Sequence, residues 1–236
     1  MKVLVMRTVG KSLKSYNGFT YPEKGLVKCP DWKPSQQCGN GLHGLLWGHG
    51  SSNIPTDNVL FQLIEVEDTP DNLIEFDGKC KFREGEVVFT GTQEDIIKAI
   101  KSHPNYPKDN ILNFDIQITT DNNKIMQSGY KSTQKAGNWS TQKAGYKSTQ
   151  KAGNWSTQTA GDESTQTAGD ESTQTAGYES TQKAGNWSTQ TAGVNSIQIG
   201  YWYDDSGDYQ VVSRIVTKDM ADKPYKFETG KWTLVK

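Results

Sequence analysis

Cysteines and apolar residues are scarce in this chain of 236 residues, and its net charge is small. Its three cysteines are too few for a disulfide framework and suit a reducing compartment. The formal net charge of −1 favours neither nucleic acid nor an anionic membrane, so we expect neither as a partner. No apolar run reaches membrane-spanning length, and the apolar start meets Arg7 too soon for a signal peptide. We therefore expect a cytoplasmic protein.

The low apolar content of 33% is explained largely by an octapeptide repeat in the second half of the chain. A glycine recurs every eighth residue from Gly129 to Gly193, and a serine recurs in step from Ser132 to Ser196. The unit reads G-x-x-S-T-Q-(K/T)-A in nine copies, of which the last is degraded. Self-similarity this strict indicates a repeat architecture.

The pair of residues after each glycine shows that the structural unit is sixteen residues long, or two octads. Counted from Gly129, odd octads carry tyrosine at Tyr130, Tyr146 and Tyr178, and even octads carry tryptophan at Trp139, Trp155 and Trp187. We predict a β-solenoid in which each turn contributes two short strands joined at two glycine corners. Successive turns would stack at the usual strand spacing of about 4.8 Å.

Strand alternation decides which side chains of the repeat face inward. The position after glutamine is lysine at Lys135, Lys143, Lys151 and Lys183, and a column of lysines is too costly to bury without partners. The threonine before each glutamine and the lysine or threonine after it must therefore face water. Serine, glutamine and alanine face inward. We expect the narrow interior to be held by serine and glutamine ladders, with tyrosines stacked along one edge and tryptophans along the other.

The octads resemble the repeats of bacterial ice-nucleation proteins, whose sixteen-residue units also contain S-T-Q-T-A-G. The likeness covers about 70 residues and implies a β-solenoid, with an outward Thr-x-Thr array as the proposed ice-organising feature. On the even octads this array survives in three successive turns, at Thr157 and Thr159, Thr173 and Thr175, and Thr189 and Thr191. Lysines such as Lys135 and Lys151 interrupt the array on the odd octads, so the sequence predicts a poor ice template.

The two aromatic columns and the lysines are further candidate binding features. Solenoid edges with exposed aromatic residues commonly pair, so we predict a homodimer through one aromatic edge. Lysines such as Lys135 and Lys151 suit a solvated face, phosphate groups or an acidic partner. The turn from Gly161 to Ala176 replaces both aromatics with Asp-Glu pairs, and this acidic belt suits neutral variation, a docking site, a cation site or a contact between two copies of the chain.

Residues 1–120 are typical of a small α+β domain. Expected strands lie at 1–8, 60–67, 73–76, 86–89 and 111–119. Thr92 can cap a helix with an acidic first turn and with Ile96, Ile97 and Ile100 on one face, ended by Pro104. The last strand would lead into the first coil of the repeat.

The sequence predicts three parts: a domain at 1–120, the solenoid at 121–200 and a β-rich cap at 201–236. In the last octad the outward pair becomes Ile197 and Ile199. We expect residues 200–236 to fold back over these two isoleucines, with turns and strands suited to a small cap. Alternatively, the isoleucines mark a subunit interface.

Two cysteines and two histidines fall within one segment: Cys29, Cys38, His43 and His49. These residue types can bind zinc tetrahedrally. Their spacing, C-x8-C-x4-H-x5-H, matches no strong zinc template and lacks the C-x2-C knuckle. We therefore predict no metal or other cofactor, and the alternative of a metal site stays open.

The whole arrangement resembles short phage and prophage proteins of unassigned function. These open with a Gly-Phe-x-Tyr stretch followed by a Cys-x-x-Gly-(Leu/Phe)-His motif, as at Gly18 to Tyr21 and Cys38 to His43. Several continue into octads and end in a Tyr-x-x-x-x-Gly-x-Trp/Phe pattern, as at Tyr225 to Trp232. This family brings no known activity with it. Our leading prediction is a non-enzymatic binding or assembly protein of phage or prophage origin, whose solenoid presents a rigid surface to a protein partner.

The order of elements around Arg7 and His43 also resembles that in ADP-ribosyltransferases. The resemblance implies a cleft that holds Arg7, His43 and Glu94 together, in an active or a degenerate enzyme. No nucleophile and base are recognisable as a pair. We therefore predict no catalytic residues, and keep ice binding and a degenerate transferase domain as the alternatives to a binding scaffold.

Overall fold

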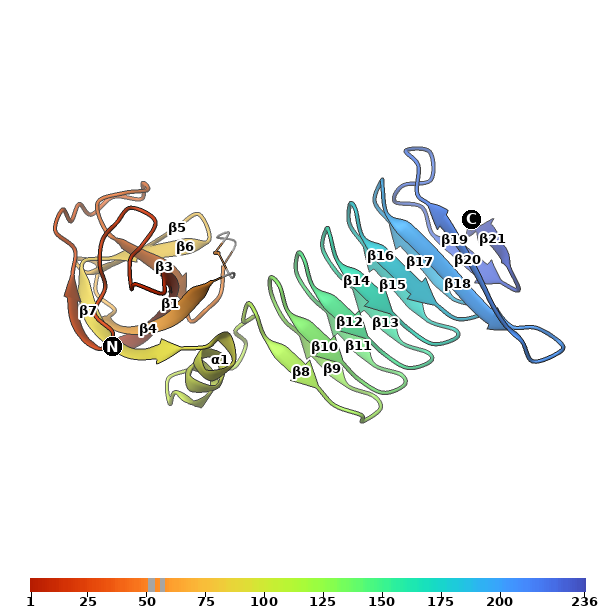
Figure 1. The fold of residues 1–236 in the computed structure, drawn as a ribbon, viewed down its shortest axis with the longest axis horizontal. Coiled ribbons are helices and arrows are strands. Elements are labelled where there is room, and N and C mark those ends of the chain that lie inside the picture. Colours follow the sequence, from red (N-terminus) through yellow and green to blue (C-terminus); the bar gives the residue numbers. More distant parts are fainter. Residues whose placement is uncertain (51–53, 56–57) are drawn as a thin grey trace. The chain divides into compact units, whose positions relative to one another are not determined.

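The computed structural model describes residues 1–50, 54–55 and 58–236 and divides into two compact units, Met1–Asn113 and Phe114–Lys236. The first is a seven-stranded sheet with one helix, and the second is a β-solenoid that ends in antiparallel strands (Figure 1). The prediction of a mainly β protein with a central solenoid is confirmed. None of the described helical residues forms a helix long and apolar enough to cross a membrane.

The sheet of the first unit is antiparallel, and β1 lies at its centre. Its strands are β1 (Lys2–Gly10), β2 (Gly25–Lys28), β3 (Leu42–Leu46), β4 (Val59–Glu67), β5 (Leu73–Phe76), β6 (Lys79–Phe82) and β7 (Glu84–Gly91), in the order β2-β7-β4-β1-β3-β6-β5. β1 pairs with β4 along its whole length, from Lys2 opposite Glu67 to Gly10 opposite Val59. The sequence predicts strands at β1, β4, β5 and β7, whereas it does not predict the four-residue strands β2 and β6.

The single helix of the described chain, α1 (Gln93–Ser102), forms as its sequence predicts. Thr92 caps it by accepting a hydrogen bond from the Asp95 backbone, and its buried face of Ile96, Ile97 and Ile100 packs on β4 and β7. The strand predicted at 111–119 is wrong in its first half, because regular pairing begins only at β8 (Ile116–Ile118). Phe114 has a left-handed backbone with φ 59°, which bends the chain just before that strand.

The solenoid has the predicted turn of sixteen residues. Thr133 pairs in parallel with Thr149, and Thr157 with Thr173, so each strand lies beside the equivalent strand one turn later. The odd sheet contains β8, β10 (Thr133–Lys135), β12 (Thr149–Lys151), β14 (Thr165–Thr167), β16 (Thr181–Ala184) and β18 (Ile197–Tyr203). The even sheet contains β9 (Ile125–Gln127), β11 (Thr141–Lys143), β13 (Thr157–Thr159), β15 (Thr173–Ala176) and β17 (Thr189–Ala192).

The stack begins one turn before the recognisable octads. β8 pairs with β10 and β9 pairs with β11 in the same register as the later turns. Ile116 and Ile118 occupy the outward positions that threonine and lysine hold in β10. The glycine and serine pattern is lost in this turn, and Gln117 is the one inward residue of β8 that keeps the repeat identity.

Two ladders of fully buried glutamines hold the interior of the solenoid. The Gln150 Nε2 donates to Gln134 Oε1 at 3.0 Å within its own column and to the Thr159 carbonyl of the opposite sheet at 3.1 Å. This double donation recurs at Gln158, Gln166, Gln174, Gln182 and Gln190. Both amide hydrogens are thereby satisfied without water, which makes a polar interior tolerable.

Serines and the residue after each glycine complete the contacts between turns. The Ser132 backbone N–H donates to the Ser148 hydroxyl at 3.2 Å, one turn later, and the Asp170 N–H donates to Asn154 Oδ1 at 3.0 Å. A Cβ on Gly169 would lie 1.8 Å from that same Asn154 oxygen. The repeated glycine is therefore required by the close approach of neighbouring turns.

The left-handed corner residue is the second residue after each glycine, and not the glycine itself. Trp155 and Glu171 both have φ 53°, and the equivalent residue of every octad has a similar positive φ. Tryptophan, glutamate and lysine thus occupy a conformation that usually favours glycine or asparagine. The hydrogen bonds between turns fix the corner strongly enough to impose this strain.

The C-terminal strands end the solenoid by changing from parallel to antiparallel pairing. β19 (Tyr209–Ile215) pairs with β18, β20 (Tyr225–Glu228) pairs with β17, and β21 (Lys231–Leu234) pairs with β20. The prediction that residues 200–236 fold over Ile197 and Ile199 is wrong, because these strands extend both sheets edge to edge and Ile197 stays 42% exposed. Pairing at the edge satisfies the open N–H and C=O groups of the last turn.

Arg214 on β19 closes the odd glutamine ladder. Its Nε and Nη2 both donate to Gln198 Oε1, at 2.9 and 2.6 Å, which takes up the last free amide oxygen of that column. The guanidinium lies 4.0 Å from the Tyr225 ring centroid and 4.2 Å from that of Trp232. Burial lowers the pKa of Arg214 to about 10. The even ladder instead ends at Gln190, whose Oε1 has no partner within the described chain.

We predict that Gln166→Leu destabilises the solenoid by about 2 kcal/mol or more, because it removes three buried hydrogen bonds and leaves Gln150 Oε1 without its donor. The lost hydrogen bonds join Gln166 to Gln150 Oε1, to Gln182 Nε2 and to the Thr175 carbonyl, which still accepts from the Ala160 N–H. Urea unfolding followed by circular dichroism measures the change. The control Thr167→Lys alters the outward neighbour on the same strand to a residue found at equivalent positions, and should cost less than about 0.5 kcal/mol. Equal costs for the two variants would contradict a ladder that holds the fold.

Candidate functional site

The even sheet carries two columns of threonines in register. Thr157, Thr173 and Thr189 pair in one column, and Thr159, Thr175 and Thr191 pair in the other. The four threonines of β13 and β15 are exposed, whereas Thr189 and Thr191 are half-buried. Strand geometry spaces the hydroxyls at about 4.8 Å between turns and about 6.6 Å along each strand. The even sheet thus presents a two-dimensional array of threonines.

The odd sheet presents a different surface. Its second outward column is Lys135, Lys151, Thr167 and Lys183, and Lys135 and Lys151 are exposed. Near its C-terminal end, the Tyr201 hydroxyl donates to the Ala168 carbonyl at 3.0 Å, and Lys183 Nζ lies 5.4 Å from the Tyr201 ring centroid. The lysines and Tyr201 leave the odd sheet without an uninterrupted threonine array.

The aromatic residues stack along the two opposite edges as predicted. The ring centroids of Trp139 and Trp155 are 5.1 Å apart with planes at 8°, and those of Tyr130 and Tyr146 are 5.6 Å apart with planes at 15°. Trp139 is 50% exposed and Trp155 is 43% exposed, whereas the two tyrosines are half-buried. These two tryptophans therefore form the more accessible aromatic surface.

The last aromatic residue of each column is held by other contacts. Trp187 Nε1 donates to the Glu228 carboxylate of β20 at 3.1 Å, and the Tyr178 hydroxyl accepts a hydrogen bond from Asn195 at 3.1 Å. The acidic turn separates both residues from the stacked pairs. The predicted site residues Trp187 and Tyr178 therefore do not belong to the continuous stacks.

The acidic turn interrupts the aromatic stacks but continues the hydrogen bonds between turns. Asp170 Oδ1 accepts from the Asn186 backbone N–H at 2.9 Å, as asparagine does in the neighbouring turns. Glu163 accepts a hydrogen bond from the Tyr146 hydroxyl and lies 3.2 Å from Lys147 Nζ. The pKa of Glu163 is lowered mainly by the hydrogen bond from the Tyr146 hydroxyl, and Lys147 lowers it further. Glu163 of the acidic belt thus contacts Tyr146 and Lys147 of the preceding turn.

The four potential zinc ligands of the first unit have separate partners. The Cys29 thiol donates to Asp31 at 3.0 Å, His49 Nδ1 lies 2.7 Å from the Ile111 carbonyl oxygen, and the His43 ring packs edge-on against Phe76. Cys38 is exposed. No three His, Cys, Asp or Glu side chains converge into a metal-binding group in the described part of the chain.

A buried lysine organises the loop that carries these cysteines. Lys81 on β6 is fully buried, and its Nζ donates to the Ser35 hydroxyl, the Gln37 carbonyl and the Gly39 carbonyl at 3.0 to 3.3 Å. The ammonium group thus gathers three oxygens of one loop. The sequence gives no sign of this role, because Lys81 is more than forty residues away from that loop in the sequence and lies in a short strand without a motif.

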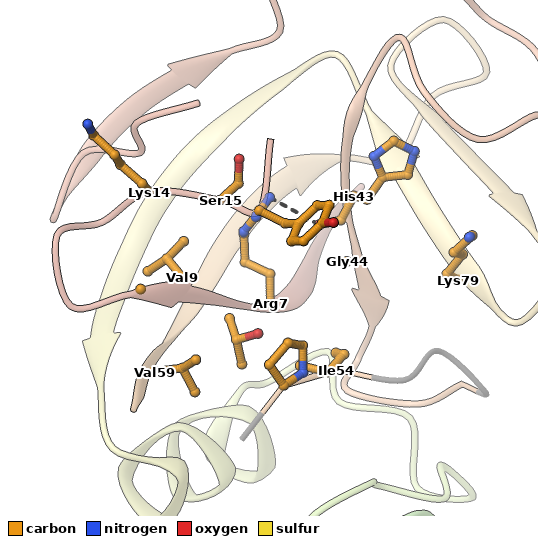
Figure 2. Close-up of a pocket in the computed structure, with 13 residues that line it drawn as sticks. Arg7, Val9, Lys14, Ser15, His43, Gly44, Ile54, Val59 and Lys79 are labelled. Carbon is orange, nitrogen blue, oxygen red and sulfur yellow. Dashed lines mark hydrogen bonds between the residues drawn. The ribbon is translucent and has the colours of Figure 1, made fainter. Parts of the chain in front are cut away.

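Arg7 and His43 line one cavity of about 490 Å³ in the first unit, as Figure 2 shows. Glu94 does not line this cavity, and its carboxylate instead pairs with Lys98 at 2.8 Å on the exposed side of α1. The prediction that Arg7, His43 and Glu94 share one cleft is wrong. The acidic first turn of α1 faces solvent because the isoleucines of that helix occupy its buried face.

Comparisons with known proteins find similarity in the repeat region. No protein family model matches the chain, and no solved structure matches it. Ice nucleation protein InaA of Pantoea ananas is 35% identical over 104 residues, which are 43% of this chain and 8% of that protein. An ice nucleation protein of Pseudomonas fluorescens is 36% identical, and one of Xanthomonas campestris pv. translucens is 30% identical, each over 43% of this chain.

The chain spans a tenth or less of the length of the curated relatives it matches. The similarity therefore concerns a stretch of 104 residues rather than a whole protein. Within that limit, the resemblance that the octads predict is confirmed: the repeat region of this chain is similar to that of ice nucleation proteins.

Proposed function

We propose that the solenoid is a non-enzymatic ice-binding scaffold that presents the threonine columns of its even sheet to ice. The observation that supports this role most strongly is the register of the two columns, with exposed hydroxyls at Thr157, Thr159, Thr173 and Thr175. The matched curated proteins are named for ice nucleation, which favours the same ligand.

The interior of the solenoid makes the threonine array suitable for a lattice of water molecules. Each strand of the array is fixed by glutamine hydrogen bonds to its neighbour and to the opposite sheet, as at Gln158 and Gln174. The hydroxyls are therefore ordered before they bind, and little further entropy is lost on contact. Each threonine also offers a methyl group for apolar contact beside its hydroxyl.

The small size of the array limits what it can do to ice. Thr141 adds a fourth residue to the first column, but Lys143 stops the second column at three. A crystal nucleus must reach a critical size before it grows, and so short an array can order only a small patch of water. We therefore propose that the isolated chain alters the growth of existing crystals more effectively than it starts new ones.

We predict that Thr175→Lys abolishes most of the ice-growth activity, because it places a hydrated charge at the centre of the even array. Thermal hysteresis and ice recrystallisation are the measurements. Thr167→Lys is the matched control, since it makes the same change at the same repeat position of the odd sheet. Lysine already occupies that position at Lys151 and Lys183, so both variants should fold.

The reverse substitution tests the same surface by gain of activity. Lys143→Thr extends the second even column to four residues and should raise thermal hysteresis above that of the parent chain. If the parent, Thr175→Lys and Thr167→Lys proteins had equal thermal hysteresis, the even sheet would be excluded as the ice-binding face. Absence of any effect of the parent chain on ice growth at high concentration would refute the proposed function.

A second role is favoured by the exposed tryptophan edge. We propose that Trp139 and Trp155 bind a protein partner, in the first instance a second copy of the chain. Two stacked, half-exposed indoles form an apolar strip of the kind that is enriched at protein interfaces. The same edge of a second solenoid would offer an identical strip, as a two-fold dimer requires.

We predict that Trp155→Glu weakens self-association at least tenfold, because it adds a charge to the apolar strip. Glutamate already occupies the equivalent corner at Glu171 with the same backbone φ of 53°, so the variant should fold normally. Sedimentation velocity over a range of concentrations gives the association constant. The control is Tyr146→Asp, which introduces at the opposite edge the residue that Asp162 already provides one turn later. A parent chain that stays monomeric at every concentration would refute a homodimer.

A further inference from the structure

The central strand of the first unit carries a buried arginine that pairs with no carboxylate among the residues that the structure describes. Arg7 on β1 is only 9% exposed. Its Nη1 donates to the Tyr21 hydroxyl and to the His43 carbonyl at 3.2 Å, which are both neutral acceptors. Within the described chain, Arg7 makes no salt bridge, and its Nε has no hydrogen-bond partner. A buried charge in this state is costly unless another group compensates it.

The Tyr21 ring compensates part of this cost. The Arg7 guanidinium carbon lies 3.6 Å from the centroid of that ring, which is a favourable position for a cation–π contact. This contact covers one face of the guanidinium and provides no negative charge. Burial remains the main influence on Arg7 and lowers its pKa.

The cavity beside Arg7 is positively charged and partly apolar. It has a volume of about 490 Å³, within the usual range for small-molecule sites. Lys14 and Lys79 also line it, whereas none of its described lining residues is Asp or Glu. In Figure 2, Arg7 lies between the apolar side chains of Val9 and Val59 and the polar side chains of His43 and Lys79.

The surroundings of His43 show the same positive field. Its Nε2 is buried and has no hydrogen-bond partner among the described residues, and its pKa is lowered by burial and by Lys79, Lys81 and Arg7. Asp31 lines an adjoining cavity with Arg7, but its two oxygens accept hydrogen bonds from Cys29 and Asn40. Both oxygens of the Asp31 carboxylate are thus engaged by other residues, and Asp31 forms no salt bridge with Arg7 in the described chain.

We infer that this cavity binds a small organic anion, with its phosphate or carboxylate group against Arg7 and its apolar part against Val9 and Val59. The planar guanidinium suits an anion with two or more oxygens, and Lys79 adds a second positive charge at the rim. The apolar lining favours an organic ligand over an inorganic ion. This inference concerns the unit Met1–Asn113 alone and is independent of ice binding by the solenoid.

The experiment uses phenyl phosphate and benzoate as probes, with benzyl alcohol as the uncharged control. Binding to the full chain is measured by titration calorimetry and by the shift in thermal unfolding, at constant ionic strength set with sodium chloride. A ligand that binds only the folded state raises the unfolding temperature. We expect at least one anionic probe to bind and raise this temperature, and benzyl alcohol to have little effect.

Three variants separate a binding role of Arg7 from a structural one. Arg7→Met should weaken probe binding at least tenfold while the unliganded protein unfolds at the same or a higher temperature, because an unpaired buried charge is removed. Lys79→Gln should weaken binding several-fold and reduce its salt dependence. Lys24→Gln removes an exposed lysine outside the cavity and should leave binding unchanged.

The outcomes decide the inference in either direction. If Arg7→Met fails to fold, Arg7→Lys keeps the charge but loses the planar fork, and it should still weaken phenyl phosphate binding. Unchanged affinity in the Arg7 and Lys79 variants would overturn the inference. So would the failure of both anionic probes to bind the parent chain, and Arg7 would then be a structural residue stabilised by Tyr21.

Discussion

The solenoid depends on one interaction, the double hydrogen bond donated by each buried glutamine amide. One hydrogen bond joins a glutamine to the preceding turn, and the other joins it to the opposite sheet, as Gln166 does to Gln150 and Thr175. These contacts fix both the spacing between turns and the distance between sheets. Because neither donor is left unpaired, a core that is poor in apolar residues can remain dry and ordered.

The dependence on inward residues explains why the outward positions vary. Threonine, lysine and isoleucine replace one another at the outward position of β8, β10 and β14 without a change in register. The even sheet can therefore keep a threonine array while the odd sheet carries lysines, on the same backbone. Surface chemistry and fold are separate in this architecture, so the two faces can serve different ligands.

The last turn of a stack of parallel strands has open hydrogen-bonding groups that must be paired. Here the residues that cover this end make contacts that do not occur within the repeats. Arg214 binds the last glutamine oxygen of the odd column, and the fully buried Phe227 contacts Trp202 and Trp232. The antiparallel strands β19 and β20 satisfy the open edges of both sheets. Apolar packing, which is sparse within the octads, is concentrated at this terminus.

The sequence by itself determined the turn of sixteen residues, the inward and outward columns and the aromatic edges. Every octad meets the same neighbours one turn away, so a contact that recurs at a fixed period leaves a visible pattern. Only the tertiary structure decided the early turn at Ile116, the edgewise cap, the buried Lys81 and the separation of Glu94 from Arg7. These features rest on arrangements that occur once in the fold and do not recur from turn to turn, so they leave no period in the sequence.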